Sequence, residues 1–147
     1  MTDLSFRQAV KADLPSIRFI ERYCFWPDLY RSARYLNNLV RSGLFYVAEV
    51  DGVLAGYISL TIHRRYLEIR DLAVLMGFRR TGIATEFLNI VFFMARILRR
   101  PRVQLTVDVS NAPACALYRK FGFEEKMLRR SYYGRSDGVL MSVHISD

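Results

Sequence analysis

Apolar and polar residues alternate along the chain with two different periods, which predict a mixture of strands and helices. A period of two is typical of a strand with one buried face, and apolar residues three or four positions apart are typical of a helix. The first period predicts strands at residues 4–10, 44–50, 53–62, 66–74, 103–107, 124–130 and 139–145. The second predicts helices at residues 14–23, 32–41, 83–98 and 111–121. The element order is therefore βααβββαβαββ.

Turn and cap residues support these boundaries. Asp51-Gly52 joins two of the strands and is the strongest hairpin signal in the sequence. Gly43 and Gly122 follow two of the helices, where glycine suits the left-handed residue after a helix. A strand, a helix and a strand around Thr81 predict a right-handed parallel crossover. The expected fold class is α/β (α+β), with a mixed sheet.

Composition favours one intracellular domain over residues 1–147. Hydrophobic residues make up 52% and charged residues 24%, as is normal for a globular domain. The longest apolar run is too short to span a bilayer, and the N-terminus lacks the apolar stretch of a secretory signal, so no membrane association is expected. Cys24 and Cys115 lie far apart and are expected to be reduced thiols of a cytoplasmic protein. His63 and His144 are isolated, are expected to be surface or packed residues, and predict no metal site.

The net charge of +8 comes from 22 basic and 14 acidic residues, and the basic residues are mostly arginine. The guanidinium fork suits phosphate and carboxylate, so an anionic ligand or partner is plausible. Because the arginines are spread over the chain and no nucleic-acid-binding motif is present, we expect no nucleic-acid partner.

The segment 79–84, Arg-Arg-Thr-Gly-Ile-Ala, follows a predicted strand and opens the long third helix. The unpaired backbone N–H groups and the positive dipole at such a helix start suit a pyrophosphate. An ordinary helix start with a solvated arginine pair would show the same local pattern.

Two motifs together resemble the GNAT superfamily of N-acyltransferases. Segment 79–84 fits the family's acetyl-CoA signature, Arg/Gln-x-x-Gly-x-Gly/Ala, although the usual proline in the preceding loop is replaced by Leu75-Met76-Gly77. Segment 110–123 is similar to its second hallmark, an Asn at a helix start followed by A-x-x-L-Y-x-x-x-G-F. The resemblance implies the GNAT fold, a twisted mixed sheet of six to seven strands with about four helices on both faces. It also implies acetyl-CoA as acetyl donor, bound by Leu72, Val74, Arg79, Arg80, Thr81, Gly82, Ile83, Ala84, Asn111 and Tyr118. Asn111 could instead serve only as a helix cap.

The C-terminal segment 128–141 resembles the ending of ribosomal-protein and other peptide N-terminal acetyltransferases. In those relatives a Tyr-Tyr hairpin and the loop between the first two helices form a groove for the substrate N-terminus. The matching aromatic residues here are Phe25, Trp26, Tyr30, Tyr132 and Tyr133. These aromatics could also be packing residues.

Amide formation from a thioester needs an acid for the thiolate, a polarised carbonyl and a base for the amine. The resemblance gives the acid role to Tyr118 and the polarising N–H to Val74. Thr106 occupies the position at which relatives carry a catalytic Glu or His, and it cannot take the proton. Glu68, acting through a water, is the expected base; its alternative role is a salt bridge with an arginine. Asp108 is a second candidate, and Asp71 is a weaker one because it should face the other way.

Three functions remain open. The expected function is acetyl transfer to the N-terminal α-amine of a peptide or protein by a monomer or weak homodimer. The alternatives are a GNAT enzyme for a small-molecule amine and a non-catalytic CoA-binding module. The small supply of acidic residues near the expected groove favours a peptide over a polycation.

Overall fold

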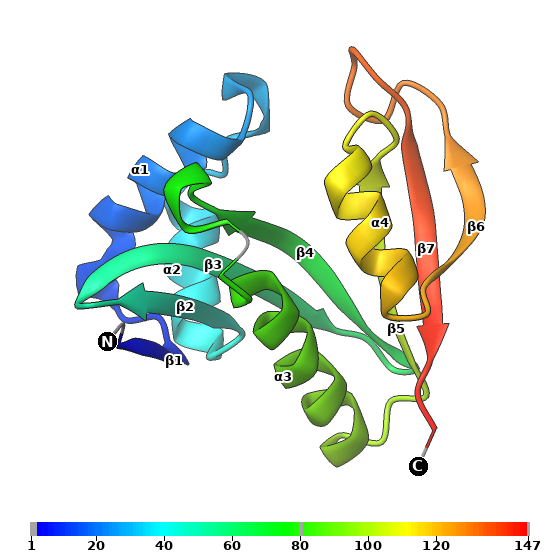
Figure 1. The fold of residues 1–147 in the computed structure, drawn as a ribbon, viewed down its shortest axis with the longest axis horizontal. Coiled ribbons are helices and arrows are strands. Elements are labelled where there is room, and N and C mark those ends of the chain that lie inside the picture. The colour runs from blue at the N-terminus through cyan, green and yellow to red at the C-terminus, as the bar shows by residue number, and fades with distance from the viewer. Residues whose placement is uncertain (1–2, 80, 147) are drawn as a thin grey trace. The chain divides into compact units, whose positions relative to one another are not determined.

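The computed structural model describes residues 3–79 and 81–146 and confirms the predicted element order (Figure 1). Within the described residues, three short 3-10 turns lie between these elements: η1 (Lys11–Asp13), η2 (Pro27–Leu29) and η3 (Met76–Phe78). The strands are β1 (Leu4–Gln8), β2 (Phe45–Val50), β3 (Val53–Ile62), β4 (Tyr66–Val74), β5 (Arg102–Asp108), β6 (Glu124–Arg129) and β7 (Gly138–His144). The helices are α1 (Leu14–Cys24), α2 (Ala33–Ser42), α3 (Ile83–Ile97) and α4 (Ala112–Lys120).

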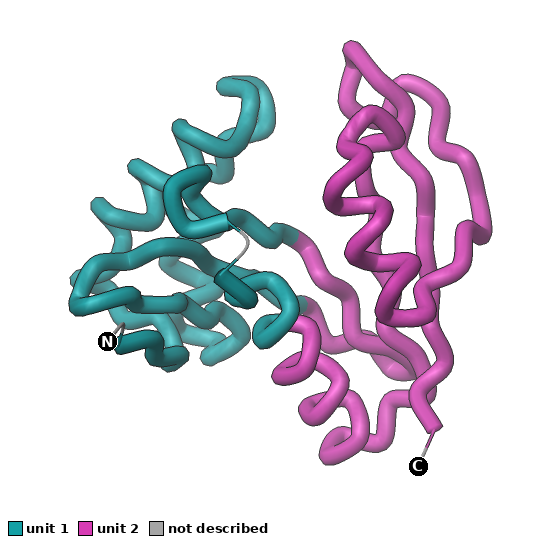
Figure 2. Tube along the Cα trace, in the orientation of Figure 1, with its two compact units in different colours: residues 1–60, 71–87 teal, residues 61–70, 88–147 magenta. Residues whose placement is uncertain are grey.

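The strands of the described residues form one mixed seven-stranded sheet, as predicted, and their order in the sheet is β1-β2-β3-β4-β5-β7-β6. The chain divides into two compact units (Figure 2). Unit 1 comprises Met1–Leu60 and Asp71–Phe87, and unit 2 comprises Thr61–Arg70 and Leu88–Asp147. No helix in the described part of the chain is long and apolar enough to cross a membrane.

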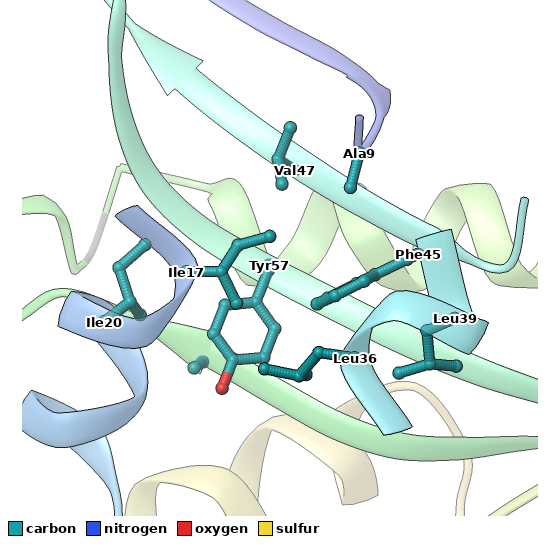
Figure 3. Close-up of a cluster of buried hydrophobic side chains, with 9 residues drawn as sticks. Ala9, Ile17, Ile20, Leu36, Leu39, Phe45, Val47 and Tyr57 are labelled. Carbon is teal, nitrogen blue, oxygen red and sulfur yellow. The ribbon is translucent and has the colours of Figure 1, made fainter. Parts of the chain in front are cut away.

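In unit 1, helices α1 and α2 pack on one face of the antiparallel strands β1, β2 and β3. Figure 3 shows Ile17 and Leu36 pointing from these helices towards Phe45, Val47 and Tyr57 of the sheet. Burial of this apolar surface is the main favourable contribution to the stability of the unit. The hairpin signal is confirmed, because Asp51 and Gly52 both have positive φ, 51° and 82°, as a type I′ turn requires.

In unit 2, the first half of β4 pairs in parallel with β5, so α3 lies in the predicted crossover between parallel strands. Strand β7 then pairs antiparallel with both β5 and β6. Phe92 of α3 contacts Phe121 and Phe123, which follow α4, with ring centroids 5.6 and 6.0 Å apart. These aromatic contacts join both helices of the unit in one core.

Candidate active site

The loop between β4 and α3 in unit 1 has the backbone geometry of an anion-binding helix start. Gly82 precedes the helix with a φ of +86°, a conformation that L side chains rarely adopt. A Cβ built on this residue would meet nothing within 4 Å, so backbone conformation rather than space explains the glycine. The Thr81 hydroxyl donates to the Phe78 carbonyl and braces the loop. The N–H groups of the first helical turn, including those of Ile83 and Ala84, have no acceptor within the helix by geometry. Arg80, which belongs to the same predicted set, lies outside the described residues.

Arg79 is exposed to solvent and also contacts the end of β4. Its Nε donates to the Val74 carbonyl at 3.0 Å, and the Cys24 thiol lies 3.6 Å from the same oxygen. Burial raises the pKa of the Cys24 thiol, and Arg79 partly opposes this shift, so the thiol stays neutral. Strand β3 comes close at this point, because a Cβ on Gly56 would lie 2.7 Å from the Ala73 carbonyl oxygen.

The two faces of β4 differ as the sequence predicts. Leu67, Ile69 and Ala73 are buried on one face, whereas Leu72 and Val74 are half-buried on the other. Leu72 and Val74 therefore point away from the core beneath α1 and α2, which includes Ala73. This face of the strand end is the one that the family resemblance assigns to the acetyl donor.

Tyr118 in unit 2 is a buried tyrosine on α4, 6% exposed, whose ring lies against Phe123 with centroids 5.6 Å apart. Burial raises the pKa of its phenol, and the neighbouring Tyr133 and Cys115 raise it further. The hydroxyl therefore keeps its proton at neutral pH, which a general acid requires. Packing and acid roles are compatible in this geometry, since the ring and the hydroxyl serve different purposes.

Asn111 is the N-cap of α4. Its side-chain oxygen accepts a hydrogen bond from the Ala114 backbone N–H at 3.2 Å, and Pro113 lies in the first turn. The cap role that the sequence left open is thus confirmed. Its predicted contact with acetyl-CoA remains a prediction.

The segment with Tyr132 and Tyr133 is held to the sheet of unit 2 by several hydrogen bonds. The Tyr133 hydroxyl donates to the Thr106 carbonyl at 3.1 Å, and the Ser131 N–H donates to the Asp137 carboxylate at 2.7 Å. Gly138 is required where the segment meets β5, because its Cβ would lie 2.9 Å from a Thr106 methyl carbon. Tyr132 remains 52% exposed and is therefore accessible for a contact with substrate.

The aromatic residues between α1 and α2 differ in exposure. Phe25 is partly buried against the core of unit 1, which agrees with the packing role considered for it. Trp26 is 59% exposed, and the Tyr30 hydroxyl lies 3.5 Å from the Arg22 carbonyl at the end of α1. Trp26 is therefore better placed than Phe25 to contact a second molecule, whereas Tyr30 is partly buried, as Phe25 is.

Each carboxylate that was a candidate for the base has its own hydrogen-bond partners. Glu68 accepts from the His63 ring at 2.7 Å and lies 3.7 Å from Arg70, so the salt bridge considered for it is present. His63 is not isolated as the sequence suggested: the turn between β3 and β4 brings it to Glu68 and stacks it on Tyr66 with centroids 4.3 Å apart. A histidine and a carboxylate five residues apart across a short turn were a signal for this pair, since the turn folds them together.

Asp108 accepts hydrogen bonds from neighbouring serine residues. Burial alone would raise the pKa of its carboxyl, but hydrogen bonds from the Ser136 hydroxyl (2.6 Å), the Ser110 hydroxyl (2.7 Å) and the Ser110 N–H (2.9 Å) lower it overall. A lowered pKa makes a weaker proton acceptor. Asp71 pairs with Arg31 and faces away from Leu72, as expected. Among the described residues, no group of three or more His, Cys, Asp or Glu could hold a metal ion.

Comparison with known proteins agrees with this arrangement. A model of the acetyltransferase (GNAT) family matches residues 9–123. An N-alpha-acetyltransferase from Sulfurisphaera tokodaii is 34% identical, covering 92% of this chain and 90% of that protein. The L-amino acid N-acetyltransferase AaaT from Escherichia coli is 31% identical, covering 90% of each. The crystal structure of the ribosomal-protein-S18-alanine N-acetyltransferase from Escherichia coli superimposes with a TM-score of 0.83 at 25% identity, covering 100% of this chain and 96% of that one. The chain therefore belongs to the acetyltransferase (GNAT) family and is an acetyl-CoA-dependent N-acetyltransferase.

Proposed function

We propose that the protein acetylates the N-terminal α-amine of a peptide or protein. The observation that carries this proposal is the similarity along nearly the whole chain to a protein named N-alpha-acetyltransferase. The exposed Trp26 and Tyr132 support it, because aromatic side chains with little conformational freedom suit contacts with a short extended peptide. An enzyme for a free amino acid is the second candidate, supported by the similarity to AaaT.

The helix start at α3 fits the pyrophosphate of acetyl-CoA. Gly82 turns the chain so that the first N–H groups of the helix, those of Ile83 and Ala84, are available to one anion. Leu72 and Val74 offer backbone groups at the end of β4, where a backbone N–H would polarise the thioester carbonyl. Arg79 braces this strand end through the Val74 carbonyl, so its role in donor binding includes positioning.

Tyr118 is proposed as the general acid that donates its phenolic proton to the leaving thiolate. Its raised pKa keeps the phenol protonated at pH 7, and it also makes the phenol a weaker acid than an exposed tyrosine, so the proposed role rests on the position of Tyr118 in the family motif. Glu68 is proposed as the base that accepts the ammonium proton of the substrate through a water molecule. Its exposed fraction of 27% leaves the carboxylate within reach of water, and its hydrogen bond to His63 fixes the direction of one oxygen.

Asp108 is a poor choice for the base, because its lowered pKa and three hydrogen bonds favour a structural carboxylate. The proposed acceptor is a peptide with few basic residues near its N-terminus. A polycation would need acidic side chains around the amine, and the candidate residues are mostly aromatic. Action in the cytoplasm and a monomeric or weakly dimeric state remain predictions from the sequence.

The proposal is tested by offering peptides and small amines together. Purified protein would be incubated with acetyl-CoA and with short peptides that begin with Ala, Ser, Met or Gly, alongside free amino acids and polyamines. We expect one acetyl group on the α-amine of at least one peptide, located by fragmentation in a mass spectrometer. Acetylation of free amino acids alone would establish the second candidate instead.

A further inference from the structure

An ionic network in unit 1 ties the segment between α1 and α2 to strand β4. Arg31 ends this segment, and its Nε and Nη2 donate to the two carboxylate oxygens of Asp71 at 3.2 and 3.1 Å. Two parallel bonds of this kind are the most directional contact that a guanidinium makes. The Ser59 hydroxyl on β3 donates to the same carboxylate at 3.1 Å. With 14% of its side chain exposed, Asp71 is held by three donors at a nearly buried position.

The same arginine is also fixed through its backbone. The Arg31 N–H donates to the Glu21 carboxylate at 2.6 Å, and Arg18 donates to that carboxylate at 2.7 Å. Arg18 also donates to the Arg31 carbonyl at 2.5 Å. Glu21 is only 1% exposed, and a buried carboxylate is tolerated only when it is fully paired. Arg31 is thus bonded to helix α1 through Glu21 and to strand β4 through Asp71, and we call this pair of contacts the Arg31 clamp.

The position of this clamp gives it significance beyond stability. The segment that it ends begins at Phe25, contains the short turn η2, and carries Trp26 and Tyr30. Phe25 anchors the start of the segment in the core, and Arg31 anchors its end. The exposed Trp26 lies between these two anchors, so the clamp limits how far it can move.

Asp71 and the donor-binding residues point to opposite faces of β4. Asp71 lies on the face that carries Ala73 and α1, whereas Leu72 and Val74 lie on the other face. We therefore expect that loss of the Asp71 carboxylate would loosen the segment with Trp26 and Tyr30 without removing a group from the strand face that is assigned to acetyl-CoA.

We infer that Asp71, acting through Arg31, is a positioning residue for the acceptor substrate. This inference rests on the proposed function, in which the segment with Trp26 and Tyr30 contacts the acceptor. The carboxylate takes no part in proton transfer, and the clamp holds the aromatic side chains in the orientation that the acceptor requires before it binds.

The test uses Asp71→Asn, which keeps the shape of the side chain and removes its charge. We expect the KM for the acceptor to rise about tenfold, while kcat and the KM for acetyl-CoA stay within about threefold. Arg31→Lys keeps the charge and loses the guanidinium fork, so its KM for the acceptor should lie between those of Asp71→Asn and the wild type. The matched control is Asp13→Asn, because Asp13 also pairs with an arginine fork in unit 1, that of Arg7 at 2.7 and 2.9 Å. The control should leave the KM for the acceptor unchanged.

Amide hydrogen exchange followed by mass spectrometry provides an independent readout. Exchange over residues 25–32 should speed up in Asp71→Asn and stay as in the wild type in Asp13→Asn. Equal effects of both variants on the acceptor KM, or faster exchange with an unchanged KM, would overturn the inference. If the wild type acetylates no peptide, the proposed function fails; the same comparison is then made with the amine that it does acetylate, and it decides the positioning role separately.

Discussion

Replacing Tyr118 with Phe should remove most of the activity and leave the fold intact. The phenol is buried with 6% exposure, and its ring contact with Phe123 at 5.6 Å is retained by phenylalanine. Since only a hydroxyl is lost, the free energy of unfolding should change by no more than about 1 kcal/mol. Loss of a general acid typically costs a factor of about 100 to 10,000, which raises the activation barrier by about 3 to 5 kcal/mol. Because burial raises the pKa of this phenol, it stays protonated below about pH 10. Any fall in the wild-type rate below that pH should therefore come from another group.

The assay follows release of the CoA thiol under steady-state conditions and measures the Kd for acetyl-CoA by calorimetry. We expect kcat of Tyr118→Phe to fall by at least about 100-fold while the Kd stays within about threefold. Tyr57→Phe is the matched control, because Tyr57 is also a buried tyrosine with a pKa raised mainly by burial and should keep its kcat. A kcat of Tyr118→Phe within threefold of the wild type would refute the acid role. Equal losses of kcat and donor affinity would show that the residue serves only packing.

Three other substitutions test separate parts of the mechanism and the fold. Glu68→Gln should lower kcat about 100-fold at pH 6.5 and much less at pH 9, because a free α-amine is largely neutral at pH 9 and needs no base. A pH–rate profile that is unchanged from the wild type would refute the base role. Gly82→Ala places a side chain at a backbone φ of +86°, which should lower the free energy of unfolding by about 1 to 2 kcal/mol. The Kd for CoA, measured by calorimetry, should rise about tenfold. An unchanged Kd would argue against this loop as the phosphate-binding site. Hydrogen bonds from Arg7 lower the pKa of Asp13 against the opposing effect of burial. The Asp13 carboxylate therefore stabilises the fold fully above its unfolded-state pKa, near 4, and this stabilisation is lost as the pH falls through the lower folded-state pKa. Urea unfolding should therefore find Asp13→Asn about 1 to 2 kcal/mol less stable than the wild type at pH 7, with the difference shrinking as the pH falls below about 4, and a constant difference would contradict this reasoning.

Local sequence signals predicted most of the fold. The hairpin at Asp51-Gly52 was predictable because few residues other than glycine, asparagine and aspartate tolerate consecutive positive φ angles. The first strand was predicted to reach Val10 but ends at Gln8, because the Val10 N–H donates to the Asp13 carboxylate instead of extending the sheet. A side-chain acceptor three residues ahead competes with strand pairing, and alternation alone does not reveal which of them wins.

The site was predictable where a role depends on neighbours in the sequence. The Asn111 cap follows from an asparagine just before a helix, whereas the positive φ of Gly82 was not predictable from its place before α3. The pairing of Arg31 with Asp71 joins residues 40 positions apart, and it depends on how α1 packs against the sheet. Hydrophobic periodicity carries no information on such a contact, since it predicts the face on which a residue lies but not its partner.

The identity of the acceptor amine is the most direct test of the proposed function. Purified protein with acetyl-CoA would be offered peptides, free amino acids and polyamines in equal amounts, and the products would be sequenced by mass spectrometry. We predict a single acetyl group on a peptide α-amine, with lysine side chains in the same peptides unmodified. Acetylation of lysine side chains or of small amines, with every peptide α-amine left free, would contradict N-terminal acetylation as the function of this protein.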